Sequence, residues 1–197
     1  MKPFVRLNLK KQQPSQKTTM SKNKIVLSDT TLTMREASVS DGGSLQQLML
    51  DTATWLKESG STQWGDILEG KDVHQLRDRI RDGEVFVLCD ADEQLAAAFI
   101  LRKTASEWDA GLWRNQKQVP ARYLHRLMIA RKYAGQNLSQ TLLDWASGES
   151  QRTGYDFLRL DCIASNQKLN TLYRVAGFTK CETVDGFCIY EKRTKEW

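Results

Sequence analysis

Hydrophobic and polar residues follow two different periods along this chain. Segments that alternate with a period of two are typical of half-buried strands, and apolar residues at every third or fourth position are typical of amphipathic helices. The predicted strands cover residues 31–37, 84–89, 94–101, 123–129, 157–162, 178–184 and 187–192. The predicted helices cover residues 41–59, 73–81, 136–152 and 166–176. The order β-α-α-β-β-β-α-β-α-β-β predicts one mixed α/β domain.

Turn-forming residues stand where the period changes. Gly60, Asp82-Gly83 and Gly177 end three of the predicted helices, and Asp185-Gly186 joins the last two strands into a hairpin. The stretch before the central strand at 123–129 has neither period, and we expect a loop there. This loop holds Trp108, Trp113 and Pro120.

The first 28 residues are polar, basic and without a period, so we expect a disordered leader at 1–28 and a folded domain at 29–197. Structure is expected to begin near Thr31. Seven Lys and Arg residues precede the first acidic residue, Asp29, and the rest of the chain has 22 basic against 24 acidic residues. The net charge of +5 therefore belongs to the leader, and nucleic-acid binding by the domain is not expected. The cations of the leader could hold phosphates non-specifically; the alternatives are a solvated tail or a segment upstream of a true start at Met20.

Composition and hydropathy predict a cytoplasmic protein that does not cross a membrane. Mean hydropathy is −0.54, no apolar run approaches the roughly 20 residues of a spanning helix, and the leader lacks the apolar core of a secretory signal. The four cysteines form no Cys-x-x-Cys pair and are interpreted as buried hydrophobes. They are Cys89, Cys162, Cys181 and Cys188. Because the only histidines are His74 and His125, neither a metal site nor a disulfide framework is predicted.

The segment 127–138 carries the first candidate chemistry. A strand runs through a short basic turn directly into a helix, whose first backbone N–H groups have no partner inside the helix. Such a turn suits a pyrophosphate, because Gly135 lets the backbone approach closely and Arg131 and Lys132 add positive charge. The alternative is an ordinary strand-to-helix turn without a ligand.

A second motif lies at 166–178 and contains Asn166, Tyr173, Gly177 and Phe178. Together the two motifs resemble the GCN5-related N-acetyltransferase (GNAT) superfamily, bacterial type. In that family a Q/R-x-x-G-x-G/A turn binds the coenzyme A pyrophosphate and an N-x-x-A-x-x-L-Y-x-x-x-G-F helix reaches the thioester. The resemblance covers roughly residues 31–193 and implies a mixed, mostly antiparallel sheet that is splayed at its centre and flanked by helices.

The resemblance also implies acetyl-CoA as co-substrate and a set of residues that bind it. In the first motif Lys132 stands for Gln or Arg, and Asn137 stands for the second Gly or Ala. Asparagine tolerates the left-handed conformation and is common at helix starts, so Asn137 can take this position. The implied cofactor-binding residues are Leu127, Met128, Ile129, Lys132, Ala134, Gly135, Gln136, Asn137, Leu138, Asn166 and Tyr173.

The implied reaction is attack of a neutral amine on a thioester carbonyl. By resemblance, the backbone N–H groups of Leu127 and Ile129 flank the acetyl group, and Tyr173 protonates the departing thiolate. His125 is the candidate base, on the same strand face as Leu127 and Ile129 by period-two alternation. The alternatives are a buried core histidine at 125 and a water held by Tyr123. An acyl-carrying Cys162 is not expected, because its thiol should stay protonated.

The acceptor site is assigned by resemblance to the region after the first strand. Trp55, Trp64 and Asp66 would form an aromatic wall with one carboxylate, although Trp55 can equally be a core residue. The predicted function is direct transfer of an acetyl group from acetyl-CoA to an amine of a small molecule or peptide. The alternative is a non-catalytic acyl-CoA-binding sensor or regulatory module. The chain is compatible with a monomer or a homodimer.

Overall fold

The computed structural model describes residues 19–21, 23–27, 30–71 and 75–195. Its strands are β1 (Thr19–Ser21), β2 (Lys24–Leu27), β3 (Thr30–Glu36), β4 (Val85–Cys89), β5 (Leu95–Arg102), β6 (Ala121–Ile129), β7 (Phe157–Ile163), β8 (Thr179–Val184) and β9 (Phe187–Arg193). Its helices are α1 (Gly42–Glu58), α2 (Gly65–Leu68), α3 (Leu76–Arg81), α4 (Glu107–Leu112), α5 (Leu138–Arg152) and α6 (Gln167–Val175). Short 3₁₀ turns cover Val39–Asp41 and Arg131–Tyr133.

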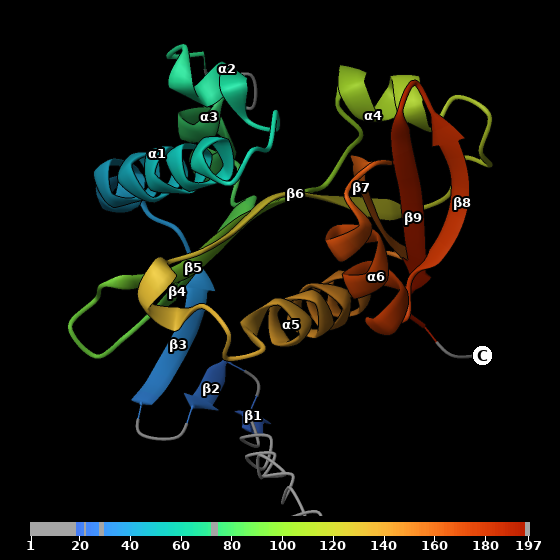
Figure 1. Cartoon of the computed structure of the whole chain (residues 1–197). Helices are drawn as coiled ribbons and strands as arrows, with labels where there is room; N and C mark the ends of the chain where they lie inside the picture. Colours follow the sequence, from blue (N-terminus) through green and yellow to red (C-terminus); the bar gives the residue numbers. More distant parts are fainter. Residues whose placement is uncertain (1–18, 22, 28–29, 72–74, 196–197) are drawn as a thin grey trace, which may run out of the picture.

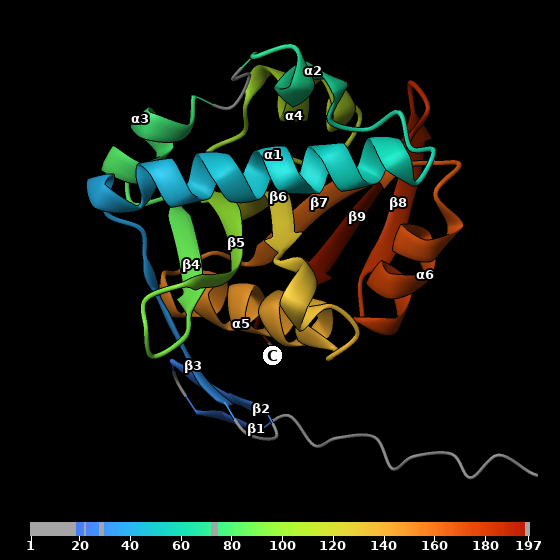
Figure 2. The same cartoon turned by 60° about the vertical axis from the view of Figure 1, so that its left-hand side comes forward.

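The strands form one sheet in the order β1-β2-β3-β4-β5-β6-β7-β9-β8. Every neighbouring pair is antiparallel except β6 and β7, which are parallel. Helices α1 to α4 lie over one face of the sheet, and α5 and α6 lie over the other (Figures 1 and 2). The predicted fold class is therefore confirmed, and no helix among the described residues is long and apolar enough to cross a membrane.

The sheet opens between β6 and β7, the one parallel pair among the described strands. Strands β6 and β7 are paired at three positions, from Ala121 opposite Phe157 to Tyr123 opposite Arg159. Beyond Tyr123 the two strands separate, although β6 continues to Ile129 and β7 to Ile163. Because β7 goes on pairing with β9 along its whole length, the gap lies between the two halves of the sheet.

A β-bulge in β6 changes which side chains face which layer. Arg126 has a φ of 51°, and the pairing with β5 shifts between Met128 and His125, so that two residues of β6 lie opposite one of β5. Leu124 and Leu127 consequently share the α5 face. His125 lies on the other face, with Met128. The expectation that His125 shares a face with Leu127 and Ile129 is wrong, because strict alternation fails at the bulge.

Two hydrophobic layers enclose the sheet. One lies under α5 and α6 and includes Leu142, Leu160 and Tyr173. The other lies under α1 and α3 and includes Leu45 and Ile80. Because helices cover both faces of the sheet, the gap between β6 and β7 is flanked by α5 and α6 on one face and by α1 to α4 on the other.

Four elements were not anticipated from the pattern. Helix α2 and helix α4 lie in stretches that we interpreted as loops, and strands β1 and β2 precede the expected start at Thr31. Ile25 and Leu27 of β2 are buried, so the last part of the expected leader packs on the domain. The leader at 1–18 and the first residues of the helix expected at 73–81, with His74, lie outside the described residues.

Candidate active site

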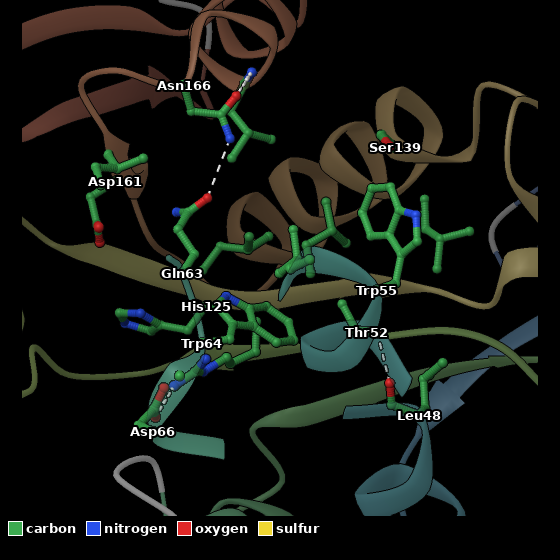
Figure 3. Close-up of a pocket in the computed structure, with 18 of the residues that line it drawn as sticks. Leu48, Thr52, Trp55, Gln63, Trp64, Asp66, His125, Ser139, Asp161 and Asn166 are labelled. Carbon is green, nitrogen blue, oxygen red and sulfur yellow. Dashed lines mark hydrogen bonds and ion pairs between the residues drawn. The ribbon is translucent and has the colours of Figure 1, made fainter. Parts of the chain in front are cut away.

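The gap between β6 and β7 opens into a cavity of about 1550 Å³ that is lined from both faces of the sheet (Figure 3). Helix α1 and the segment that leads to α2 form one wall, with Thr52, Trp55 and Trp64. The start of α5 and the length of α6 form the opposite wall, with Ser139 and Tyr173. The cavity therefore follows the opening in the sheet.

The turn before α5 has the conformation that its sequence suggested. Gly135 has a φ of 80°, and Asn137, the residue before the helix, has a φ of 58°. A Cβ atom at Gly135 would have no heavy atom within 4 Å, so the turn leaves open space there. Ala134, Gly135 and Ser139 line the cavity. The unpaired N–H groups of the first turn of α5 therefore lie at one end of the cavity.

Not every residue of the implied cofactor set faces this space. Leu127 and Ile129 line the cavity, whereas Met128 and Leu138 are buried in the hydrophobic layers. Gln136 and Asn137 belong to the turn without lining the cavity. The surface of the cavity at this end therefore comes from their neighbours, such as Ala134 and Gly135.

The basic side chains of the turn have separate partners. Lys132 Nζ lies 3.1 Å from Asp90 Oδ2, so this ammonium points to the β4–β5 hairpin instead of the cavity. The guanidinium of Arg131 lies 4.3 Å from the centre of the Trp55 ring. Arg131 and Trp55 both line the cavity near the start of α5. The positive charge beside the turn is therefore that of Arg131.

Helix α6 brings the second motif to the cavity. Asn166 caps the helix by accepting a hydrogen bond from the Leu169 N–H at 3.1 Å, and its side-chain amide donates to Gln63 Oε1 at 3.3 Å. Tyr173 lines the cavity about two turns further along the same face of the helix, and its ring packs against Phe178 and Tyr190. Burial raises the pKa of Tyr173 above its ordinary value, so the phenol stays protonated and can donate.

His125 forms a buried pair with Asp109 from α4. His125 Nε2 lies 3.1 Å from Asp109 Oδ2, which also accepts hydrogen bonds from the N–H and the hydroxyl of Ser106. Burial alone would raise the pKa of Asp109, but the hydrogen bonds from His125 and Ser106 outweigh it and lower the pKa below its ordinary value. An ionised Asp109 only accepts, so the His125 nitrogen that faces it carries the hydrogen.

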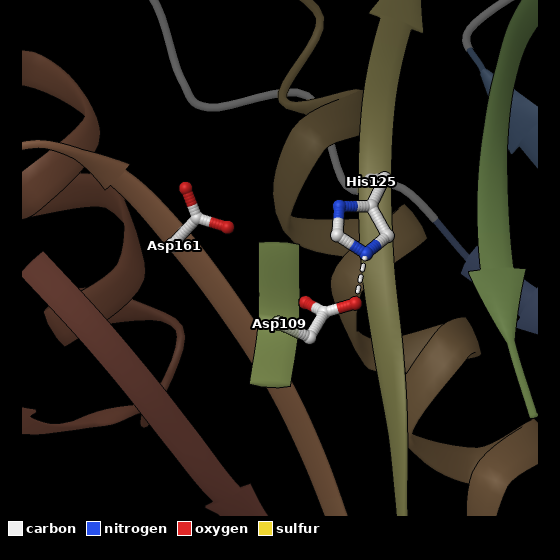
Figure 4. A group of neighbouring side chains, drawn as sticks. All are labelled: Asp109, His125 and Asp161. Atoms are coloured by element: carbon white, nitrogen blue, oxygen red, sulfur yellow. Dashed lines mark hydrogen bonds and ion pairs between the residues drawn. The ribbon is translucent and has the colours of Figure 1, made fainter. Parts of the chain in front are cut away.

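A second carboxylate, that of Asp161 on β7, lies across from the pair. Ligand atoms of Asp109, His125 and Asp161 lie within 4.8 Å of one another (Figure 4). In this view Nε2 is directed at Asp109, while Nδ1 lies on the side of Asp161. Two carboxylates and an imidazole are a ligand set that a divalent cation accepts, although the sequence predicted no metal site. The direct His125–Asp109 hydrogen bond also fits a base and the group that orients it.

The residues expected to form the acceptor wall occupy two places. Asp66 Oδ2 accepts a hydrogen bond from Arg126 at 2.6 Å, and the same guanidinium lies 4.6 Å from the centre of the Trp64 ring. Trp55 lies apart from them, near Ser139 and Arg131 (Figure 3). Trp64 and Asp66 thus stand on the His125 side of the cavity, and Trp55 stands at the end where α5 begins.

Sequence reasoning missed Asp109, Asp161 and Trp108. The spacing of Ser106 and Asp109 is that of a capping box, and both reciprocal hydrogen bonds are present at the start of α4. That signal could have revealed the helix and its acidic residue. Asp161 is part of a strand with alternating residues, so the sequence indicated which face of the strand is polar but not which residues of other elements lie beside it. Cys162, the excluded nucleophile, is buried, which raises the pKa of its thiol to about 12.

Comparison with known proteins shows a consistent set of relatives. The family model of the acetyltransferase (GNAT) domain matches residues 56–186. The uncharacterized N-acetyltransferase YesJ of Bacillus subtilis (strain 168) is 38% identical over 158 residues, which are 77% of this chain and 84% of that protein. An acetyltransferase of the GNAT family from Listeria monocytogenes 4b F2365 is 43% identical, with a TM-score of 0.78 over 87% of this chain and 99% of that chain. The PaiA N-acetyltransferase of Thermoplasma acidophilum, solved in complex with coenzyme A, shares the fold at 19% identity, with a TM-score of 0.65 over 82% of this chain and 98% of that chain.

Proposed function

The chain belongs to the GNAT family of acetyltransferases, and from this premise we propose that it moves an acetyl group from acetyl-CoA directly to an amine. Acetyl transfer is the activity of the family, and the chain is an acyltransferase. The proposal concerns the acceptor and the residues that carry out the transfer.

One observation carries the proposal. A proton donor and a proton acceptor line the same cavity, because both Tyr173 and His125 reach it through the gap between β6 and β7. A thioester held in that gap would have a phenol on one side and an imidazole on the other. Amine attack needs both, one to accept a proton from nitrogen and one to protonate sulfur.

The start of α5 is the proposed site for the pyrophosphate of acetyl-CoA. Its unpaired N–H groups and the positive end of the helix favour an anion, and Gly135 leaves room for one. Arg131 adds a cation that is held against Trp55. The related fold from Thermoplasma acidophilum was solved in complex with coenzyme A, which supports coenzyme A as a ligand of this fold.

In the proposed reaction the residues divide the proton transfers. His125, oriented by Asp109, takes a proton from the amine, and its positive form is stabilised by that carboxylate. Backbone N–H groups in the part of β6 that β7 leaves unpaired, at Leu127 and Ile129, stabilise the oxyanion. Tyr173 gives its proton to the thiolate as the intermediate collapses. Cys162 takes no part because its thiol is protonated.

The rival function is that of a sensor that binds acyl-CoA without turnover. Release of coenzyme A thiol from acetyl-CoA, measured with a panel of amines, separates the two, and calorimetric titration with acetyl-CoA reports binding independently. We expect binding and amine-dependent thiol release. Tight binding without turnover of any amine would favour the sensor, and absence of binding by folded protein at millimolar acetyl-CoA would contradict both functions.

We also propose that the enzyme works in the cytoplasm. Cys89, Cys162, Cys181 and Cys188 are free thiols, and three of them are buried. Free thiols fit a reducing compartment. Localisation of the tagged protein by cell fractionation tests this assignment.

A further inference from the structure

Asp161 is a partly buried carboxylate of β7 that lines the cavity, with the charges of His125 and Arg126 in its surroundings. In the described part of the chain no Lys or Arg forms an ion pair with it, and Trp108 Nε1, at 3.3 Å, is its hydrogen-bond donor. Arg126 is directed at Asp66 instead. Burial raises the pKa of Asp161 above its ordinary value. A desolvated carboxylate costs free energy, so binding of a positively charged ligand would stabilise the folded protein.

Aromatic rings stand beside this carboxylate at the mouth of the cavity. Trp108 and Phe187 pack edge to face with ring centres 4.8 Å apart, and both line the cavity with Asp161. Trp108 is 46% exposed although it is a large apolar residue. Ring faces attract cations and hydrocarbon chains alike, so these two rings suit an alkyl group that carries a charge.

We infer that Asp161, Trp108 and Phe187 bind the ammonium group of an alkyl amine, which is the acceptor of the acetyl group. This inference rests on the proposed acetyl transfer and adds to it the chemical class of the acceptor. The ammonium donates to Asp161, and its hydrocarbon part lies against Trp108 and Phe187. In this position the nitrogen is next to His125, whose ligand atom lies within 4.8 Å of that of Asp161.

The protons of the acceptor balance in this site. An alkyl ammonium loses one proton to His125, and the neutral nitrogen forms the bond to the acetyl carbon. As the carbon–sulfur bond breaks, Tyr173 protonates the thiolate, and the second proton that leaves the nitrogen restores the Tyr173 phenol, while His125 passes the first proton to solvent. The sum is one amide, one thiol and one proton released to solvent. The amide is uncharged, so it no longer pairs with Asp161 and is released.

Acceptors that lack this charge pattern should react poorly. An α-amino acid carries its own carboxylate beside the amine, which Asp161 would repel. An arylamine is largely neutral at pH 7 and gains nothing from Asp161. An alkyl amine has a pKa near that of lysine, about 10.4, and enters as the cation. We therefore expect the highest kcat/KM with alkyl amines and much lower values with α-amino acids and arylamines.

The test compares wild type with Asp161→Asn on a panel of alkyl amines that includes 2-phenylethylamine, together with phenylalanine and 4-methylaniline. We expect the KM of the best alkyl amine to rise by about 10- to 100-fold in Asp161→Asn, as for loss of a charged hydrogen bond, while the KM of acetyl-CoA stays unchanged. Glu107→Gln is the matched control, because Glu107 is an exposed carboxylate on the same rim and should have little effect.

Thermal unfolding gives a readout besides turnover. If Asp161 stabilised the fold, Asp161→Asn would lower the melting temperature. Because we propose that this carboxylate serves binding and has no ion-pair partner, Asp161→Asn should raise the melting temperature. Addition of 2-phenylethylamine should stabilise wild type and not the variant.

Three outcomes would overturn this inference while the proposed function stands. They are an unchanged amine KM in Asp161→Asn, a wild-type preference for arylamines or α-amino acids, and loss of activity in EDTA that a divalent cation restores. The last result would assign Asp109, His125 and Asp161 to a metal instead. Absence of turnover with every amine would contradict the proposed function itself.

Discussion

His125 and Tyr173 line one cavity but belong to opposite faces of the same sheet. Tyr173 lies in the layer beneath α5 and α6, whereas His125 pairs with Asp109 of α4 on the other side. The two meet only because β6 and β7 separate beyond Tyr123. The opening in the sheet therefore sets the proposed site, because it brings the proposed base and the proposed acid to one cavity, whereas continued pairing of β6 with β7 would keep them apart.

Replacement of Tyr173 by Phe tests the proposed acid. The ring contacts with Phe178 and Tyr190 are kept, and only the hydroxyl is lost. We expect kcat to fall by about 10² to 10⁴, the usual contribution of a general acid, with little change in acetyl-CoA affinity or melting temperature. Steady-state kinetics and calorimetry measure the two effects.

Tyr190→Phe is the control for that variant. The Tyr190 hydroxyl donates to Asn170 Oδ1 at 2.6 Å in a buried site, so its loss should lower stability by about 1 kcal/mol and leave kcat nearly unchanged. Full activity in Tyr173→Phe with a good acceptor would exclude the assigned role.

The His125–Asp109 pair is expected to act as a unit. His125→Ala should reduce kcat/KM by about 10² to 10⁴, and Asp109→Asn should reduce it as well by removing the group that orients the ring. The double variant should lose little more than His125→Ala alone, because the two residues serve one proton transfer. If the two losses in kcat/KM multiply in the double variant, His125 and Asp109 have independent roles.

Gly135→Glu is expected to abolish acetyl-CoA binding. The new side chain would place bulk and negative charge in the open space before α5, where we propose that the pyrophosphate binds. Gly154→Glu provides the control, because Gly154 also has a positive φ and open surroundings but lies beyond the other end of α5. Both variants carry similar backbone strain, so calorimetric affinity should fall only in Gly135→Glu. Equal acetyl-CoA affinities in the two variants would show that the cofactor does not bind at this turn.

The raised pKa of Asp161 makes a prediction about stability and pH. Burial raises this pKa above the ordinary value, and the charges of His125, Asp109 and Arg126 face the same carboxyl. Between the ordinary and the raised pKa the folded protein binds more protons than the unfolded chain, so its stability should fall as pH rises through that window. Urea unfolding at several pH values should show a shallower fall in Asp161→Asn than in wild type. Parallel curves would contradict the shift.

Local patterns predicted the parts of the site that are local in sequence. The Gly135–Asn137 turn and the helix that starts at Asn166 each depend on neighbours within a few residues, so their residue types and spacing were sufficient. The Asp109–His125–Asp161 group was out of reach, because three separate elements converge there only after the strand order is known. The face of His125 was mistaken for a related reason. Nothing in the sequence marks Arg126 as a residue with positive φ.

Strand β2 was missed because only three apolar residues, Ile25 to Leu27, stand among polar ones, and it supplies the last prediction. Ile25 is fully buried against the main core, whereas its neighbour Val26 is 45% exposed. Ile25→Ala should cost about 2–5 kcal/mol, as a cavity in a core does, and lower the melting temperature by about 5 to 15 °C. Val26→Ala, which removes a similar side chain from the opposite face of the same strand, should stay within about 0.5 kcal/mol of wild type. Thermal unfolding of both variants measures this difference. If Ile25→Ala unfolds at the same temperature as wild type, β2 contributes nothing to the core. The domain would then begin at β3, as the hydrophobic pattern alone predicts.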